Sequence, residues 1–411
     1  MPPGSKMPAS SSIDLIFRAS RMIALLKSPF SLARFVLVCA ALTLGGAAAR
    51  AETIETQARQ AILIDYKTGT ILLEKNSDEL MVPSSMSKLM TAYLVFEKLK
   101  EGSWKMDDQL PVSETAWKRH FKSGGSLMFL PVGSSAKVGD LIRGVIIQSG
   151  NDACSVLAEA HSGTEEAFAE EATRKARDLG MLHTTLRNAS GWPDPEHLTT
   201  ARDLSILARR LISDFPEYFP IYSEREFVFN GIRQGNRNPL LYGVSGADGL
   251  KTGHTEAAGY GLVGTVKRGE RRIIMVINGL KSMKERSEES ARLMEWAFRE
   301  FDNYALFKPG DMVTDAEVWL GEAANVPLVA GEKLEVTMPH KARREMKVTA
   351  VYDGPIAAPI RKGETLGKLL ITAPGQANVE LPLVAGADVA KLGFTGRMSE
   401  ALRHILLGPK R

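Results

Sequence analysis

The run from Pro83 to Leu99 constrains the fold more than any other stretch, because it reads as a helix that is apolar on nearly every side. Apart from Lys88, its only charged residues are Glu97 and Lys98, near the end. A helix that is hydrophobic all round must be buried, so the first domain is predicted to form around this one. Its start is well marked, since proline fixes φ and the serines that follow can cap the free backbone N–H groups.

Ser85 and Lys88 are the chemically reactive residues of this run, because a spacing of three places both side chains on one helix face. A helix start also favours an anion, such as the one that a serine forms when it loses its proton. Desolvation disfavours the charged form of a lysine on an apolar helix, so Lys88 is predicted to be a neutral base. The pair thus predicts a serine nucleophile with its own base. The pattern is weak by itself, since Ser134 and Lys137 repeat it in a turn-like stretch.

Length and charge limit the class of protein. The 411 residues exceed what one core normally holds, so two domains are expected. The formal net charge is +4, but residues 1–51 contain six lysines and arginines against Asp14, which leaves −1 for the rest of the chain. A near-neutral body offers no electrostatic footprint for nucleic acid, so no nucleic-acid partner is predicted.

Residues 1–51 are predicted to be an export signal that is removed. The apolar run Phe35–Leu44 follows cationic residues, and Ala49-Arg50-Ala51 fits a cleavage site. This run is too short and wrongly flanked for a membrane span. A start at Met22 would give a more ordinary signal, and we expect translation to begin there. The mature chain then keeps Cys154 as its one cysteine, which excludes an intrachain disulfide.

The first domain, residues 52–307, is predicted to be α+β. Gln60–Asn76 reads as a hairpin, and two later strands at 259–266 and 272–277 form another. Helices are expected at 83–99, 140–148, 153–160, 165–179, 199–212 and 287–301, with a polar loop at 227–242. An antiparallel sheet whose early and late strands flank a helical cluster accommodates this order.

Two further segments follow the boundary at Phe307-Lys-Pro-Gly310. Residues 308–386 hold short alternating stretches broken by proline and glycine, which predicts a small all-β sandwich. Residues 387–411 are predicted to be a stem and an amphipathic helix whose apolar face consists of Phe394, Met398, Ala401, Leu402 and Ile405. Such a helix with a cationic opposite face suits the interface of a membrane with anionic lipid. The alternative is a helix packed on its own domain.

Two short motifs lie further along the chain from Ser85. Ser149-Gly150-Asn151 is the chain's one Ser-x-Asn, and it stands between two predicted helices where side chains can reach a cleft. Lys251-Thr252-Gly253 precedes the later strands, where glycine would let a substrate backbone approach closely. A second Lys-Thr-Gly, at Lys67, is explained by hairpin turn chemistry. The seven histidines are scattered without ligand spacing, so neither a metal nor a cofactor is predicted.

Ser-x-x-Lys, Ser-x-Asn and Lys-Thr-Gly in this order are the motif set of penicillin-binding proteins and serine β-lactamases. The mature chain most resembles the low-molecular-mass serine D-Ala-D-Ala carboxypeptidases, whose catalytic domain has the β-lactamase/DD-peptidase fold. The resemblance extends to the small β domain, the amphipathic tail and five further stretches, at 126–130, 141–144, 148–154, 229–234 and 248–255.

The resemblance implies a role for each motif residue. Ser85 would attack the carbonyl between two D-alanines of a peptidoglycan stem pentapeptide, with Lys88 as general base. Ser149, with Lys251, would pass a proton to the departing amine. The remaining roles would be substrate binding by Asn151, Lys251, Thr252 and Arg237, and an oxyanion hole from the backbone N–H groups of Ser85 and His254. β-Lactams should acylate Ser85, and the protein would act at the periplasmic face of the cytoplasmic membrane.

One position departs from the family pattern, and three other functions stay open. The family that this chain resembles has a histidine before the Gly-Trp pair where this chain has Ser190, so a different deacylation rate and substrate preference are open. A β-lactamase is one alternative, although no Glu-x-x-Leu-Asn stretch lies between Ser149 and Lys251. A peptidoglycan DD-endopeptidase is another. A non-catalytic wall-binding protein with a relic site is the third.

Overall fold

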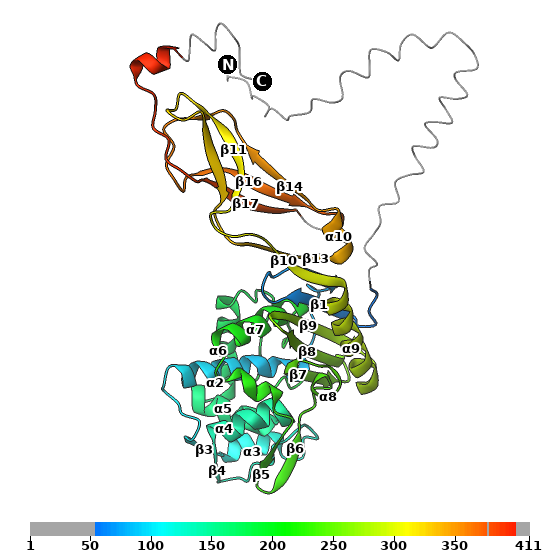
Figure 1. Ribbon diagram of the computed structural model, residues 1–411. Helices are drawn as coiled ribbons and strands as arrows, with labels where there is room; N and C mark the ends of the chain where they lie inside the picture. The colour runs from blue at the N-terminus through cyan, green and yellow to red at the C-terminus, as the bar shows by residue number, and fades with distance from the viewer. Residues whose placement is uncertain (1–53, 376–377, 400–411) are drawn as a thin grey trace, which may run out of the picture. The chain divides into compact units, whose positions relative to one another are not determined.

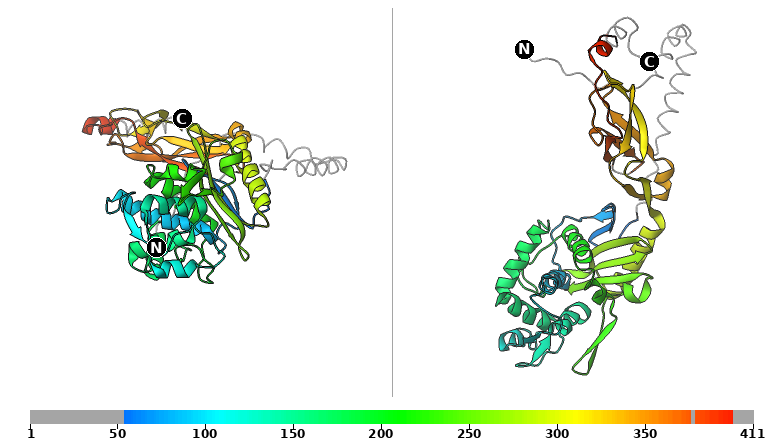
Figure 2. Two further views of the ribbon diagram at one scale, coloured as in Figure 1. Left: turned by 90° about the horizontal axis from the view of Figure 1, so that it is seen from below. Right: turned by 60° about the vertical axis from the view of Figure 1, so that its left-hand side comes forward.

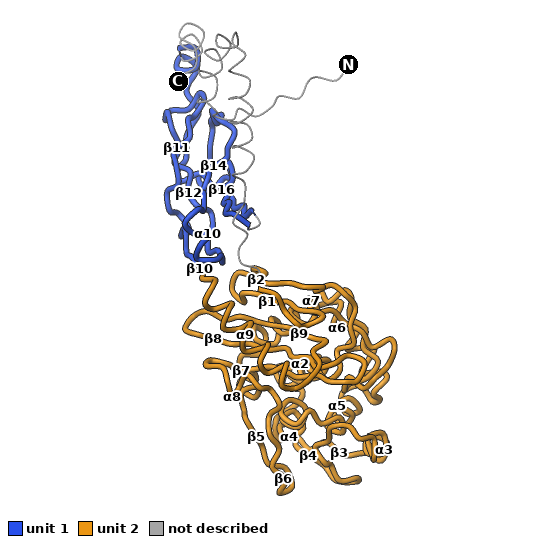
Figure 3. Tube along the Cα trace, turned by 90° about the vertical axis from the view of Figure 1, so that its right-hand side faces the viewer, with its two compact units in different colours: residues 1–52, 304–411 blue, residues 53–303 orange. Residues whose placement is uncertain are grey.

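A computed structural model describes residues 54–375 and 378–399 of the chain. Its contacts divide the chain into two compact units, Thr53–Asn303 and the part from Tyr304 onward (Figure 3). The division between Asn303 and Tyr304 falls inside strand β10 (Phe301–Phe307), a few residues before the predicted boundary at residue 307. The predicted export signal with its Met22 start, and the anchor-helix residues from 400 onward, lie outside the described residues.

A five-stranded sheet in the order β2-β1-β9-β8-β7 forms the centre of the first unit (Figure 1). All of its pairs are antiparallel, and the hairpin of β1 and β2 joins β9, so the beginning and end of the domain close one sheet. Its strands are β1 (Gln60–Asp65), β2 (Ile71–Lys75), β7 (Ala247–Thr255), β8 (Gly259–Arg268) and β9 (Arg271–Leu280). The predicted α+β fold class is confirmed.

Helices cover both faces of this sheet. On one face α9 (Met283–Glu300) packs its buried Leu293, Met294 and Ala297 against the strands. A larger cluster lies on the other face: α2 (Lys88–Lys100), α3 (Glu114–His120), α4 (Val138–Arg143), α5 (Asn151–Ser162), α6 (Glu165–Asp178) and α7 (Ala201–Asp214). Two short strands, β3 (Gln109–Pro111) and β4 (Ser135–Lys137), pair beside it.

Helix α2 forms the centre of the larger core, as its apolar sequence predicted. The right-hand view of Figure 2 looks along this helix, with other helices and the sheet around it. Its residues Leu89, Leu94 and Phe96 are at most 1% exposed. The prediction of a serine cap is wrong. A 3₁₀ turn, η2 (Ser84–Ser87), precedes α2, and neither element has a side-chain hydrogen bond at its N-terminus. The Ser87 hydroxyl donates to the Ser84 carbonyl instead.

The prediction of a polar loop at 227–242 is also wrong. The structure has a hairpin of β5 (Glu226–Phe229) and β6 (Ile232–Gly235), followed by a turn of helix, α8 (Leu240–Gly243). Asn230 and Gly231 both have positive φ, as a two-residue hairpin turn of type I′ requires. The Asn-Gly signal was present, but the polar residues around it obscured the strands.

The second unit contains a six-stranded sheet in the order β14-β16-β17-β12-β11-β15 and a two-stranded sheet of β10 and β13. Its elements are β11 (Met312–Trp319), β12 (Asn325–Ala330), β13 (Leu334–Pro339), α10 (His340–Arg344), β14 (Lys347–Tyr352), β15 (Ile356–Ala357), β16 (Thr365–Thr372) and β17 (Val379–Ala385). Helical conformation begins again at 394, where Phe394 and Met398 are 70% and 61% exposed. Among the described residues, no helix is long and apolar enough to span a membrane.

Candidate active site

Ser85 and Lys88 meet at the junction of η2 and α2, where the amine Nζ lies 2.8 Å from the Ser85 hydroxyl. The amine also donates to Asn151 Oδ1 at 2.8 Å and to the backbone carbonyl of Ser190. An amide oxygen and a carbonyl oxygen only accept hydrogen bonds, so they occupy both N–H groups of a neutral amine. The amine lone pair is then free to accept the proton of Ser85.

Burial determines the protonation of Lys88. The side chain is 1% exposed, and desolvation lowers its pKa from 10.5 to about 8. This pKa of about 8 already includes a smaller lowering by the charge of Arg237 and an opposing increase from nearby acidic side chains, among them Glu165 and Asp152. The neutral fraction of this lysine is therefore far larger at neutral pH than that of a lysine in water.

Ser149 and Asn151 reach the same point from the start of α5. The chain passes from η3 (Gly144–Gln148), a π-helical turn, through Ser149 in the left-handed region at φ 67°. Such a conformation is costly for a residue with a side chain and is concentrated at functional sites. It breaks the helix, so that Ser149 lines the cavity while Asn151 turns its amide to Lys88.

Strand β7 brings the third motif to the site. Lys251 and Thr252 are 2% and 6% exposed, and the Lys251 amine donates to the Thr252 carbonyl at 3.2 Å. Burial, together with the charge of Lys88, holds the pKa of Lys251 well below 10.5. Gly253 lines the cavity, and it also has a packing role that was not predicted, because a Cβ at this position would lie 2.8 Å from the Pro83 carbonyl oxygen. This glycine lets β7 pack against the start of the catalytic helix.

These elements surround a cavity of about 740 Å³. Six of the eight predicted site residues line it: Ser85, Ser149, Asn151, Arg237, Thr252 and His254. Lys88 and Lys251 are buried next to them. The two repeated patterns lie elsewhere, since Ser135–Lys137 forms strand β4 and Lys67–Gly69 forms the turn after β1.

The cavity also contains a cation that the sequence analysis missed. Arg286 of α9 lines it, is 6% exposed, and has an Nε without a hydrogen-bond partner among the described residues. Burial lowers its pKa to about 10, so the guanidinium is charged at neutral pH. Arg237 lines the same cavity, and its Nη1 donates to the Ser126 hydroxyl. No motif marks Arg286, because helix packing alone brings it to the site.

The site geometry agrees with comparisons to known proteins. Residues 47–282 match the peptidase S11 family, described as D-alanyl-D-alanine carboxypeptidase. The chain belongs to this family. Residues 301–391 match the C-terminal domain of penicillin-binding protein 5. The predicted resemblance to D-Ala-D-Ala carboxypeptidases is thereby confirmed.

Individual peptidase S11 relatives match over most of their length. The D-alanyl-D-alanine carboxypeptidase DacC of Escherichia coli is 39% identical over 351 residues, which are 84% of this chain and 88% of the relative. The structure of penicillin-binding protein 5 from Haemophilus influenzae is 35% identical, with a TM-score of 0.73 over 83% of this chain and all of that one. Penicillin-binding protein D2 of Listeria monocytogenes, solved in an ampicillin-bound form, is 31% identical, with a TM-score of 0.53 over 60% of this chain and all of that one.

In this peptidase S11 chain, Ser190 contacts the active site through its backbone. Its carbonyl accepts from Lys88, while its hydroxyl bonds to the Asn188 side chain at 3.3 Å. A change of side chain at this position therefore leaves the acceptor for Lys88 in place. Gly191 follows with φ 77°, and a Cβ there would lie 1.9 Å from the Ser84 carbonyl oxygen. Glycine at 191 is what allows the loop to lie this close to the nucleophile.

Proposed function

We propose that this protein removes the terminal D-alanine from peptidoglycan stem pentapeptides through an acyl-enzyme on Ser85. One observation carries the proposal: the Lys88 amine is buried within 2.8 Å of the Ser85 hydroxyl, and acceptor-only oxygens occupy its other positions. This arrangement provides a nucleophile and its base without a metal or cofactor.

Acylation begins with the transfer of the Ser85 proton to Lys88 as Oγ attacks the carbonyl between the two D-alanines. The backbone N–H groups of Ser85 and His254 stabilise the oxyanion, a contribution of about 3 kcal/mol per donor in other enzymes. The tetrahedral intermediate breaks its C–N bond as Ser149, with Lys251, delivers a proton to the leaving amine. The proton that Lys88 took from Ser85 replaces it, so that Lys88 is neutral again. Water then attacks the ester, which regenerates Ser85 and releases the shortened peptide.

Cationic groups select a substrate with a free terminal carboxylate. Arg237 and Arg286 line the cavity, and Lys251 lies buried beside Thr252 on β7. A guanidinium in a partly dehydrated site binds a carboxylate through charge-assisted hydrogen bonds. We therefore assign the carboxylate of the terminal D-alanine to Arg237, Thr252 and Lys251, with Arg286 as a further cation.

Arg286→Gln should raise KM about tenfold or more for a peptide with a free terminal carboxylate, and should change kcat much less. The reason is that one charge-assisted hydrogen bond contributes about 1.5–3 kcal/mol to binding. Steady-state release of D-alanine measures both constants. The same peptide with a terminal amide should respond little to this substitution. An equal loss for both peptides would mean that Arg286 does not bind the carboxylate.

Penicillins should acylate the same serine, because they resemble the D-Ala-D-Ala dipeptide. The ampicillin-bound Listeria relative supports this extension, and the missing Glu-x-x-Leu-Asn stretch supports a long-lived penicilloyl-enzyme. A β-lactamase would instead turn the antibiotic over quickly. Mass spectrometry over time distinguishes a persistent adduct from rapid hydrolysis.

The proposed activity is tested by measuring D-alanine release from diacyl-Lys-D-Ala-D-Ala by the purified protein. Comparison of monomeric and cross-linked muropeptides then separates a carboxypeptidase, which prefers the monomer, from an endopeptidase. A protein that binds muropeptides but releases no D-alanine and takes up no penicillin would be a wall-binding protein instead.

We also propose that the protein is exported and acts at the outer surface of the cytoplasmic membrane. The predicted signal in residues 1–51 supports export. The exposed Phe394 and Met398 support membrane contact through the tail, because both lie on its predicted apolar face. A protein truncated after Gly386 should lose its partition into membranes, whereas unchanged partition would contradict the anchor.

A further inference from the structure

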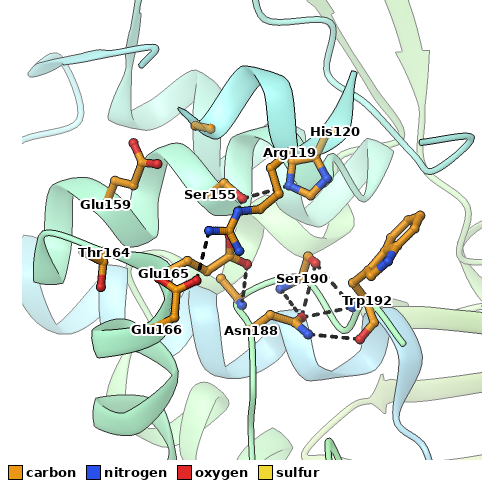
Figure 4. A network of polar contacts seen from close by, with 12 residues as sticks. Arg119, His120, Ser155, Glu159, Thr164, Glu165, Glu166, Asn188, Ser190 and Trp192 are labelled. Atoms are coloured by element: carbon orange, nitrogen blue, oxygen red, sulfur yellow. Dashed lines mark hydrogen bonds and ion pairs between the residues drawn. The ribbon is translucent and has the colours of Figure 1, made fainter. Parts of the chain in front are cut away.

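Glu165 is a buried carboxylate beside the active site whose position has no role in the mechanism above. It is the first residue of α6 and is 2% exposed. Figure 4 shows it at the meeting point of α3, α5 and the loop that carries Ser190. Burying a carboxylate is costly unless hydrogen bonds and a cation compensate, so its contacts need an explanation.

Three groups from three separate elements contact this carboxylate. Ser155 of α5 donates its hydroxyl to Oε2 at 2.6 Å, and Arg119 of α3 places its Nε 3.3 Å from the same oxygen. The other oxygen, Oε1, accepts the backbone N–H of Ala189 at 3.0 Å. Ser155 has only one proton to give, so its oxygen accepts from His120 Nε2 at 2.8 Å.

The Ala189 contact connects Glu165 to the catalytic lysine. The carbonyl of the next residue, Ser190, accepts from the Lys88 amine. Within the loop, the Asn188 side chain accepts the backbone N–H groups of residues 190, 191 and 192 at 3.1, 2.7 and 3.0 Å. These hydrogen bonds hold the loop together internally. Glu165, which lies outside the loop, holds it in place through the backbone N–H of Ala189.

We propose that Glu165 is a positioning residue, which holds the 188–192 loop so that the Ser190 carbonyl orients the Lys88 amine toward Ser85. Arg119 and Ser155 in turn hold the Glu165 carboxylate. The inference rests on the proposed function, since it assigns Lys88 the role of base. A catalytic group displaced by about 1 Å can lose about a hundredfold in rate, so a loop contact of this kind matters to catalysis.

Charge provides a second connection between these two residues. The negative charge of Glu165 favours the ammonium form of Lys88 and therefore raises its pKa. The other charged or titratable groups that act on Lys88 or respond to its charge are Asp152, Cys154, Arg237, Lys251, His120 and His197. Removal of the Glu165 charge alone should thus lower the Lys88 pKa.

The test compares Glu165→Gln with Glu166→Gln in the full chain. Glu166 pairs with the same Arg119 at 3.0 Å, but its side chain is 68% exposed, which makes it a matched control. For Glu165→Gln we expect the limiting kcat/KM for D-alanine release to fall between about tenfold and a hundredfold. The midpoint of the pH profile should also move to lower pH. Glu166→Gln should change neither quantity.

Arg119→Gln provides an independent test, because it should move the midpoint of the pH profile in the opposite direction to Glu165→Gln. Without this cation the Glu165 carboxylate acts more strongly on Lys88, so the midpoint should move to higher pH. A purely structural role would lower thermal stability in both variants without moving the two midpoints apart.

Two results would overturn the inference. Wild-type release and unchanged midpoints in both Glu165→Gln and Arg119→Gln would refute it while leaving the proposed function intact. A wild-type protein that neither releases D-alanine nor is labelled by a fluorescent penicillin would refute the function, and this inference with it.

Discussion

Ser85→Ala should release D-alanine from diacyl-Lys-D-Ala-D-Ala about 10⁴- to 10⁶-fold more slowly than the wild type. The loss is this large because removal of the nucleophile leaves only binding and oxyanion stabilisation. The same variant should bind no penicillin covalently, which a fluorescent penicillin followed by denaturing electrophoresis would reveal. Folding should be unaffected, since the substitution removes one oxygen at the cavity wall.

Ser134→Ala is the matched control, because Ser134 belongs to the other Ser-x-x-Lys pattern of the chain. That residue precedes strand β4 and is absent from the cavity lining. Its substitution should leave both D-alanine release and penicillin labelling unchanged. Residual labelling of Ser85→Ala at the wild-type rate would show that another residue is the nucleophile.

Lys88→Arg should lower the rate of Ser85 acylation by about 10³-fold or more, with a fluorescent penicillin as the reporter. Arginine is a similarly long, basic side chain, but its guanidinium stays protonated and offers no lone pair to the Ser85 hydroxyl. The substitution thus removes the base and puts a permanent cation in its place.

Lys137→Arg controls for the chemical change itself. Lys137 pairs with Asp107 at the surface, an ion pair that arginine can also form. Acylation should proceed at the wild-type rate in this variant. If Lys88→Arg also acylated normally, a positive charge near Ser85 would be sufficient and the neutral-amine mechanism would be wrong.

The sequence was most informative where chemistry depends on neighbours in the chain. Ser85 and Lys88 are one helical turn apart, so helix geometry alone brought them together, and the apolar composition of α2 foretold their burial. Arg286 and Glu165 could not be found this way. Each reaches the site through packing between distant elements, and neither belongs to a recognisable motif.

Backbone contributions were equally hidden from the sequence. The partner of Lys88 at position 190 is a carbonyl, which every amino acid possesses, so no sequence pattern could mark this contact. The effect of a serine side chain there on deacylation stays a prediction. The Lys-Thr-Gly glycine was predicted to allow a substrate to approach closely, but its close contact with the protein's own Pro83 carbonyl was not foreseen. Such backbone contacts depend on the folded arrangement of the chain, and no sequence pattern marks them.

For the fold too, local features could be predicted from the sequence and long-range pairings could not. Antiparallel hairpins and amphipathic helices could be predicted because their hydrophobic patterns are local. The pairing of β1 with β9, which closes the sheet, joins residues more than two hundred positions apart. The order of elements predicted one sheet of early and late strands, but it could not give this pairing or its register. The hairpin of β5 and β6 was missed because its strands are only four residues long and a polar stretch follows Ile232.

The pH dependence of Ser85 acylation by a penicillin tests the central claim most directly, since it reports the ionisation of Lys88 in the free enzyme. A lysine is a base only above its pKa, so the second-order rate constant should rise with pH through a midpoint of about 8. A rate that is constant through neutral pH, or that rises only near the ordinary lysine value of 10.5, would contradict the account.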